Sequence, residues 1–444
     1  MSFRGASGPP TRTSMELAPR HRLSFQLPGP WPACAQGLLR EGAAWLHSGD
    51  TGEGLLTLPG RVLRSIWDGQ AWLSAKDGIP LPHSPWEALE IGLQGQPCPW
   101  VGAASFELAC DEAGLPRKPL GRGSLGQHWM EVREALHVQD GRAELWSWAE
   151  APPDAAAWET RLSPACGPTY ALGCATASLE ALWEEAQHRA AVERIRTRIL
   201  EGGFYVANLC VPFQGRLMGD PVTFALSAFN RARPPFGALL DLGGLRLLSL
   251  SMERLLARRG DRLWSQPIKG SVPLTGDPEQ DAAAATALAA DPKERAEHTM
   301  ILDLVRNDLG RVARAGSVRV VRPMAVESYP TVQHLVSTVE ATARPGLGLA
   351  ELLRAVLPGG SVTGAPKHAV CGHLAQAEAA PRGFYCGAVG WIAPNGDLDL
   401  ALPIRTAQIE GERLTYWTGG GITRRSDPGR EWAELHLKTR ALLG

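Results

Sequence analysis

The sequence predicts an α+β fold in which mainly antiparallel sheets are layered against flanking helices. Segments with helical spacing alternate with strand-like segments that turn back on themselves, whereas parallel sheets need a helical crossover between successive strands. The chain has 444 residues, more than most single domains need. We expect three parts, which are a disordered leader over 1–22, an N-terminal region over 23–178 and a larger C-terminal domain over 179–444.

The clearest elements lie in the C-terminal domain. A helix is expected over 179–201. It ends at Gly202-Gly203, because glycine readily adopts the left-handed conformation that caps a helix C-terminus. Pro292 stands at the tolerated first turn of a second helix. The remaining expectations are helices at 291–308, 367–380 and 430–443, strands at 204–213, 245–250, 262–264, 317–321 and 414–417, and one alternating strand over 398–409.

Charge and cysteine usage exclude several classes of protein. The 46 acidic and 45 basic residues nearly cancel, so we expect neither nucleic acid nor a membrane surface as a partner. The apolar stretches are too short to span a bilayer, and residues 1–22 lack the apolar segment of a signal peptide. The eight cysteines form no C-x-x-C pair, which favours buried, reduced thiols in the cytosol.

Two glutamate pairs are candidates for metal binding. Glu294 and Glu297 lie three residues apart on one expected helix, and Glu431 and Glu434 do so on another. This spacing puts both carboxylates of a pair on one helix face, and two facing helices can hold a hard dication between them. Two solvated helix faces would produce the same spacing.

Two glycine-rich segments are candidates for anion binding. Residues 358–367 form a loop before an expected helix, where free N–H groups favour negative charge. They are not a nucleotide-binding P-loop, because Ala365 stands where that motif requires lysine. Residues 418–422 follow a strand, and their three glycines permit close approach of a ligand to backbone N–H groups. An ordinary turn and a flexible loop are the alternatives.

Three single residues complete the candidates. Arg405 lies on the polar face of the expected strand over 398–409 and is suited to gripping a carboxylate. Lys269 is a candidate nucleophile if desolvation favours its neutral form. His334 is an imidazole within an apolar run. An exposed strand residue, a surface lysine and a structural histidine are the respective alternatives.

Together and in this order, these motifs resemble the chorismate-utilising enzymes, over roughly residues 179–442. The resemblance rests on 294–311, 333–337, 359–367, 383–390 and 404–407. It implies the fold predicted above, chorismate as substrate and Mg²⁺ as cofactor. It also implies roles for individual residues: direct metal ligands Glu297 and Glu434; water-mediated ligands Glu294 and Glu431; carboxylate binding by Arg405 and Tyr385; backbone N–H donors at Gly419, Gly420 and Gly421; ring-side residues Ser361 and His334; positive charge at Lys438.

The motif Pro-Ile-Lys-Gly-Ser, which contains Lys269, resembles the corresponding motif of one branch of the family. That branch makes 4-amino-4-deoxychorismate for 4-aminobenzoate and folate synthesis. There the lysine is the implied nucleophile, and Glu253 matches the acid/base carboxylate. Ammonia would come from a separate glutamine amidotransferase subunit in the cytoplasm. Val206 stands where the water-adding branches carry a lysine, which argues against hydroxylation.

Two alternatives stay open at this point. The first is anthranilate synthase component I, which would add ammonia at C2 and release pyruvate. The second is a non-catalytic protein that binds chorismate or tryptophan. Met252 and Ser271 depart from the commoner Pro and Thr of the motifs, and Val206 departs from the usual Gln of the amino-transferring branches.

Overall fold

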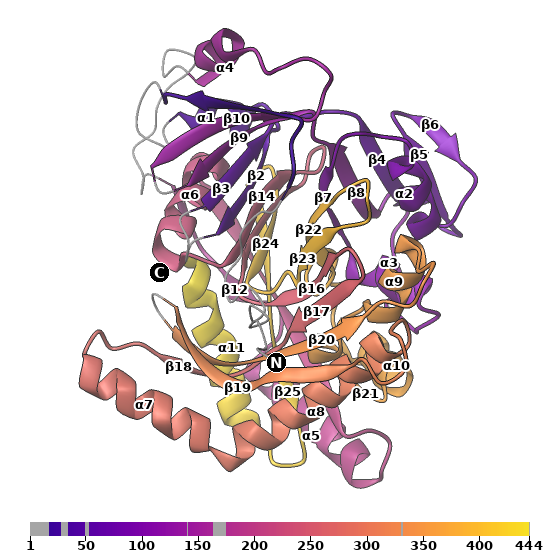
Figure 1. The fold of residues 1–444 in the computed structure, drawn as a ribbon. Helices are drawn as coiled ribbons and strands as arrows, with labels where there is room; N and C mark the ends of the chain where they lie inside the picture. Colours follow the sequence, from indigo (N-terminus) through magenta and orange to yellow (C-terminus); the bar gives the residue numbers. More distant parts are fainter. Residues whose placement is uncertain are drawn as a thin grey trace, which may run out of the picture.

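Two large sheets dominate the computed structural model of the chain (Figure 1). The structure describes residues 17–27, 34–48, 53–139, 141–162, 175–329 and 332–443. Every strand pair among them is antiparallel, and helices lie against the sheets, which confirms the predicted α+β class. Most of the expected leader lies outside these residues, but Leu17 is buried and the first strand begins at His21.

The first sheet has 13 strands within the described ranges and runs in the order β1-β10-β9-β3-β2-β14-β15-β24-β25-β13-β11, with β12 and β21 also paired to β13. Its strands are β1 (His21–Phe25), β2 (Ala44–Ser48), β3 (Glu53–Thr57), β9 (Glu134–Gln139), β10 (Arg142–Ser147), β11 (Thr176–Ala177), β12 (Glu180–Ala181), β13 (Val206–Met218), β14 (Phe236–Asp241), β15 (Arg246–Ser251), β21 (Gly364–Ala365), β24 (Thr406–Glu410) and β25 (Arg413–Ile422).

The second sheet has 12 described strands in the order β18-β20-β17-β16-β23-β22-β7-β8-β4-β5-β6, with β19 also paired to β20. Its strands are β4 (Val62–Trp67), β5 (Trp72–Lys76), β6 (Ile79–Leu81), β7 (Trp100–Ala104), β8 (Leu125–Glu131), β16 (Arg254–Arg259), β17 (Arg262–Gln266), β18 (Ile268–Pro273), β19 (Arg319–Tyr329), β20 (Val332–Thr342), β22 (Ala388–Ile392) and β23 (Leu398–Ala401).

The helices begin and end at recognisable signals. Asp277 and Asp291 accept N–H groups of the first turns of α7 and α8, and a proline follows each cap. The α-helices are α1 (Ala35–Arg40), α2 (Pro85–Leu93), α3 (Phe106–Glu112), α4 (Ala155–Leu162), α5 (Glu185–Leu200), α6 (Pro221–Ala232), α7 (Pro278–Ala290), α8 (Pro292–Gly310), α9 (Leu349–Val356), α10 (Lys367–Ala377) and α11 (Pro428–Leu443). None of these described helices is long and apolar enough to cross a membrane.

Both halves of the chain contribute to both sheets. In the first sheet β2 pairs with β14, and in the second β7 pairs with β22. Figure 1 shows the N-terminal strands, drawn in indigo and purple, beside the later strands of the same sheets. The N-terminal region and the C-terminal domain, which the sequence divides near residue 178, are therefore packed together in the same two sheets.

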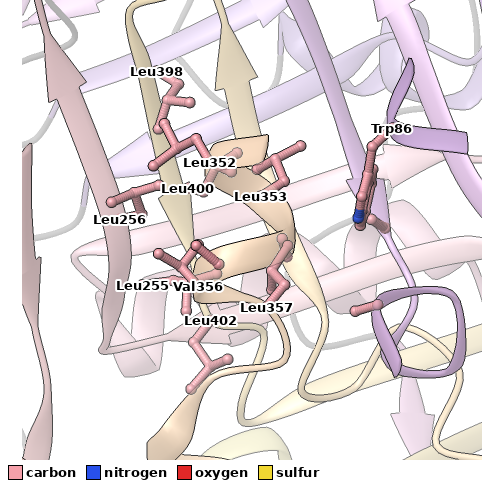
Figure 2. Packing of buried hydrophobic residues seen from close by; sticks show 14 of the residues in the cluster. Trp86, Leu255, Leu256, Leu352, Leu353, Val356, Leu357, Leu398, Leu400 and Leu402 are labelled. Atoms are coloured by element: carbon pink, nitrogen blue, oxygen red, sulfur yellow. The ribbon is translucent and has the colours of Figure 1, made fainter. Parts of the chain in front are cut away.

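The largest core cluster lies between α9 and the second sheet (Figure 2). Leu352 and Val356 of α9 pack in it together with Leu256 and Leu400 of strands β16 and β23. Six of the eight cysteines are described, and all six are buried, as expected, whereas Cys166 and Cys174 lie outside the described residues.

Three expected elements differ from the structure. The single strand over 398–409 is instead β23 and β24, which belong to different sheets, and Arg405 adopts a positive φ of 50° between them. Alternating polarity cannot reveal this change of sheet. Gly419, Gly420 and Gly421 lie within β25 rather than in a loop. The helix expected from 179 begins at Glu185, because Glu184 caps it and β12 precedes it.

Candidate active site

The two glutamate pairs lie on α8 and α11 and face a common space. Glu297 of α8 is mostly buried, and burial raises the pKa of its carboxyl. The ammonium groups of Lys269 and Lys293 oppose this rise, whereas the Glu431 carboxylate of α11 adds to it. The Glu431 carboxylate of α11 therefore lies within electrostatic reach of Glu297 of α8.

In the glutamate pair on α11, the charge of Lys438 lowers the pKa of Glu434. Burial raises the pKa of Glu431, and the neighbouring Glu434 carboxylate contributes to the same rise. Burial acts on Glu434 as well, but the Lys438 ammonium lies 2.7 Å from its Oε1 and holds its pKa below the usual value. This i,i+4 pair keeps one carboxylate of the site ionised.

The donor set fits a hard dication, although the side chains do not enclose one. Within the described ranges, no group of three or more His, Cys, Asp or Glu side chains is close enough to surround a metal ion. Mg²⁺ binds through one or two carboxylates and keeps several waters, so it needs no closed protein cage. Burial and neighbouring carboxylates raise the pKa values of Glu297 and Glu431. A dication bound between such groups would stabilise their ionised forms.

Lys269 lies on β18 and reaches the glycine segment of β25. The β18–β20 ladder shifts register between Lys269 and Ser271, where Gly270 has a φ of 73°. A Cβ atom placed on Gly421 would come within 2.7 Å of Lys269 Nζ. The absence of a side chain at Gly421 leaves space for this ammonium group, which an added methyl group would displace.

The neighbouring glycines have the same function for the carboxylates. A Cβ on Gly270 would lie 3.1 Å from Glu294 Oε2, and a Cβ on Gly420 would lie 2.9 Å from Glu431 Oε2. Lys269, both glutamate pairs and the glycine segment consequently surround one space. The sequence predicted each motif, and folding brings them together.

Glu253 lies buried beside this space, between β15 and β16. Ser361 Oγ donates a hydrogen bond to Glu253 Oε1 at 2.7 Å. Burial raises the pKa of Glu253 to about 7, against the opposing effects of Ser361 and of the Lys269 charge. The group thus exchanges protons near neutral pH, as a general acid/base requires.

His334 of β20 lies within electrostatic reach of Arg405, which stands between β23 and β24. His334 Nδ1 lies 2.7 Å from Ser271 Oγ, and the ring is almost fully buried. Burial, reinforced by the charges of Arg405 and Lys438, lowers the pKa of His334 to about 3, so the imidazole is neutral at neutral pH. Burial also lowers the pKa of the Arg405 guanidinium.

Tyr385 is almost fully buried. Its ring stacks on Trp417 with 6.2 Å between centroids and 12° between planes. Burial raises the pKa of the Tyr385 phenol, with a smaller contribution from Tyr416, whose own phenol is electrostatically coupled to Arg405. Tyr385 therefore lies behind the β25 segment, within electrostatic reach of the Arg405 region.

The glycine segment offers backbone groups along an open edge. Residues Asn208 to Cys210 of β13 pair with Gly421 to Gly419, while β24 pairs with β25 only as far as Tyr416. Lys438 Nζ donates to Gly419 O at 2.6 Å. Because alternate residues of a strand point their N–H and C=O groups to the same side, Gly421 directs its N–H to this edge too.

Several residues of the site had escaped sequence analysis. Lys293 lies 4.0 Å from Glu294 and 3.9 Å from Glu297. Its i,i+4 spacing from Glu297 was a usable signal. Arg382 and Glu378 form a buried ion pair behind the glycine segment. Their four-residue spacing was a signal for the ion pair, but no local pattern marks their backbone partners, which are distant in sequence.

A second hollow lies between the two sheets, away from the predicted catalytic residues. It is lined by residues of both halves, which include His47, Phe236, Trp391 and Asp399. Arg254 holds the Asp399 carboxylate, with Nε 2.9 Å from Oδ1. None of the predicted site residues lines this pocket.

The sequence model of the chorismate binding enzyme family matches residues 67–444 of the chain. The chain therefore belongs to this family. Aminodeoxychorismate synthase component 1 of Klebsiella aerogenes is 35% identical over 380 residues, which cover 83% of each chain. Anthranilate synthase component 1 of Thermus thermophilus is 40% identical over 269 residues, or 60% of this chain and 58% of the relative. The predicted resemblance is therefore confirmed, and the match extends into the N-terminal region.

The fold is also that of a solved relative. The crystal structure of anthranilate synthase component I from Streptococcus pneumoniae superimposes with a TM-score of 0.75 at 23% identity, covering 88% of this chain and 92% of the other. This likeness confirms the layered architecture.

Proposed function

We propose that the chain is component I of an aminodeoxychorismate synthase and converts chorismate and ammonia to 4-amino-4-deoxychorismate. The observation that carries the proposal is the Lys269 ammonium, which lies against Gly421 within electrostatic reach of Glu253 and Glu297. The name of the Klebsiella aerogenes relative, which matches over 83% of both chains, supports it.

Lys269 would act as a temporary nucleophile. Its neutral amine bonds to C2 of the ring, the double bond shifts, and the C4 hydroxyl leaves as water. Ammonia then bonds to C4, the double bond shifts back, and Lys269 departs with a proton that ammonia gives up. Protonated Glu253 supplies the proton for the leaving hydroxyl and then takes one from the lysine nitrogen. The sum is one ammonia consumed and one water released.

The four glutamates would hold Mg²⁺, with Glu297 and Glu434 as direct ligands and Glu294 and Glu431 acting through waters. When bound, the ion supplies Lewis-acid stabilisation of the ring carboxylate and of the departing hydroxyl. Lys438 keeps Glu434 ionised, which readies it as a ligand.

The remaining residues would orient the substrate. Arg405 and Tyr385 are assigned to the enolpyruvyl carboxylate, together with the backbone N–H groups of Gly419 and Gly421. Gly420 pairs with Leu209, and strand alternation directs its N–H to β13 instead. The Lys438 ammonium adds positive charge on the side of the metal. His334 and Ser361 are assigned to the ring and the leaving group, and a neutral His334 can offer a hydrogen bond without adding charge.

The ammonia would come from a separate glutamine amidotransferase subunit in the cytoplasm. The words "component 1" in the relative's name support a two-component enzyme. No nucleic acid or membrane partner is needed for this reaction.

Anthranilate synthase component I is the second candidate, and the Thermus thermophilus relative is the observation that favours it. Product analysis separates the two. We expect the purified chain, given chorismate, Mg²⁺ and ammonium, to form 4-amino-4-deoxychorismate, as measured by chromatography. Fluorescent anthranilate formed with equimolar pyruvate would instead identify the second activity. Turnover of any kind excludes a non-catalytic chorismate- or tryptophan-binding protein.

The covalent role of Lys269 has its own test. We expect Lys269→Ala to lower product formation by at least about 100-fold, because the nucleophile is removed. Lys76→Ala is the matched control, since Lys76 donates to Gly92 O far from the site in the N-terminal region. Product formation by Lys269→Ala at the wild-type rate would exclude the lysine adduct.

A further inference from the structure

The outer edge of β13 has a gap opposite the glycine segment. On that edge β21 pairs with Val206 and Ala207, and β12 pairs with Phe213 and Gln214. No strand within the described ranges lies against the edge between them, at Asn208 to Cys210. Buried backbone groups need partners, so other groups must replace the missing strand.

Arg382 and Glu378 fill this gap. Arg382 Nη2 donates to Asn208 O at 2.9 Å, and Cys210 N donates to Glu378 Oε1 at 3.1 Å. The two side chains also form a bidentate ion pair. Arg382 Nε donates to Glu378 Oε2 at 3.0 Å, and Nη2 donates to Oε1 at 2.6 Å. Both are buried, with 1% and 6% of the side chain exposed.

The same guanidinium reaches the second glycine-rich segment. Arg382 Nη1 donates to Val362 O at 2.8 Å. Val362 follows Ser361, whose hydroxyl bonds Glu253. Asn208 Nδ2 also donates to Val362 O, at 3.2 Å. One side chain therefore ties the 359–364 loop to β13.

The opposite edge of the same β13 residues holds Gly419 to Gly421. A displacement of Asn208 to Cys210 would consequently move the glycine segment that lies against Lys269. It would also change the position of Ser361 relative to Glu253. The two glycine-rich parts of the site are aligned by hydrogen bonds that meet at Arg382.

Residues of α3, in the N-terminal region, also contact Arg382. The Phe106 ring of α3 lies 4.4 Å from the guanidinium carbon. Glu107, the next residue of α3, accepts the backbone N–H groups of Arg382 at 2.6 Å and of Gly383 at 3.0 Å. The position of Arg382 thus depends on both halves of the chain.

We propose that Arg382 and Glu378 are positioning residues for the reaction on chorismate. They act through the β13 backbone and the 359–364 loop, and neither touches the substrate. This inference rests on the proposed function only for the identity of the substrate. A shift of about 1 Å in a catalytic group can lower the rate about 100-fold, so a pair that fixes two segments has a large effect on turnover.

The test compares two mild variants with a matched control. Arg382→Lys keeps the charge but cannot span three partners, and Glu378→Gln keeps the shape but weakens the grip on Arg382. Glu131→Gln is the control, because Glu131 is equally buried and is held by Arg61 and Arg133 in the N-terminal region. Circular dichroism and thermal unfolding establish that each variant is folded.

We expect kcat/KM for chorismate consumption to fall about 10- to 100-fold in Arg382→Lys and Glu378→Gln, with part of the loss in KM. Glu131→Gln is expected to lower the unfolding temperature but to leave KM unchanged. Guanidinium ion added to Arg382→Ala should restore part of the activity. Folded variants with wild-type kcat and KM would overturn the proposal, as would a Glu131→Gln loss of equal size. Chorismate consumption is measured whichever product forms, so an error in the proposed product leaves this test intact.

Discussion

At the scale of single residues, the site depends on what surrounds each charge rather than on the charges themselves. Glu253, Glu297 and Glu434 are all glutamates, yet burial raises the pKa of the first two, while Lys438 holds that of the third below its usual value. The Glu253 carboxyl can therefore exchange a proton near neutral pH, whereas the Glu434 carboxylate is held ionised.

The pKa of Glu253 predicts a pH dependence of stability. Its folded-state pKa of about 7 lies above the ordinary value of 4.5, so the folded protein holds this proton more tightly than the unfolded chain. The resulting stability is fully present below about pH 4.5 and is lost as pH rises through about 7. We expect the difference in unfolding free energy between wild type and Glu253→Gln to change by up to about 3 kcal/mol across this window.

Urea unfolding of both proteins from pH 4.5 to 8 measures that difference. Glu107, whose pKa is also raised to about 7 by burial, is present in both proteins and cancels. A difference that stays constant with pH would mean that Glu253 keeps an ordinary pKa.

Gly421 provides a second test at this scale. A Cβ at this position would lie 2.7 Å from Lys269 Nζ, so the flexible end of the lysine would have to move. We expect Gly421→Ala to displace the lysine and to lower turnover by about 100-fold or more, with little change in the unfolding temperature. Gly121→Ala, at an exposed position before β8 where a Cβ would meet nothing within 4 Å, is the comparison for the effect of a methyl group on a glycine. Equal activity of Gly421→Ala and wild type would place the working position of Lys269 elsewhere.

At the scale of elements, α9 links the core to the strands that flank the site. Leu352 is fully buried in the cluster that contains β16 and β23, and β16 begins directly after Glu253. We expect Leu352→Ala to lower the unfolding free energy by about 2–5 kcal/mol, through lost burial and the cavity that remains.

Chemical denaturation followed by circular dichroism measures this loss. Leu200→Ala provides the contrast, because Leu200 is 75% exposed at the end of α5 and its truncation should change stability by less than about 0.5 kcal/mol. Similar losses for the two variants would contradict the packing of α9.

At the scale of the whole molecule, the metal ligands meet only when the chain folds. Glu294 and Glu297 precede Glu431 and Glu434 by more than a hundred residues, so Mg²⁺ should bind the folded state alone. We expect saturating Mg²⁺, at about 100 times its Kd, to raise the unfolding free energy by about 2.7 kcal/mol. Glu297→Gln and Glu434→Gln should lose this gain.

Thermal unfolding with Mg²⁺ and with a chelator tests the metal site without any turnover. Without metal, Glu297→Gln should be at least as stable as wild type, because burial disfavours its carboxylate. Glu193→Gln on α5, where Glu193 pairs only with the exposed Arg196 among the contacts described, should retain the full response to Mg²⁺. A response that survives in Glu297→Gln and Glu434→Gln would show that the ion binds elsewhere.

Sequence alone determined the family, the α+β class and every motif of the candidate site. These features are local: helical spacing displays the glutamate pairs, and glycines mark the backbone that must approach a ligand. The change of sheet at Arg405 and the strand conformation of Gly419 to Gly421 depended on the tertiary structure. An alternating pattern records only burial, and burial is the same whichever sheet a strand joins.

Only the tertiary structure decided which side chains act on one another. Lys269 meets Gly421 because a bulge in β18 redirects it, and Glu253 meets Ser361 across more than a hundred residues of sequence. Arg382 had no signal beyond its four-residue spacing from Glu378, since its other partners include backbone carbonyls that any residue type provides. Side-chain chemistry can be read from the sequence, but these backbone contacts exist only after both sheets have formed.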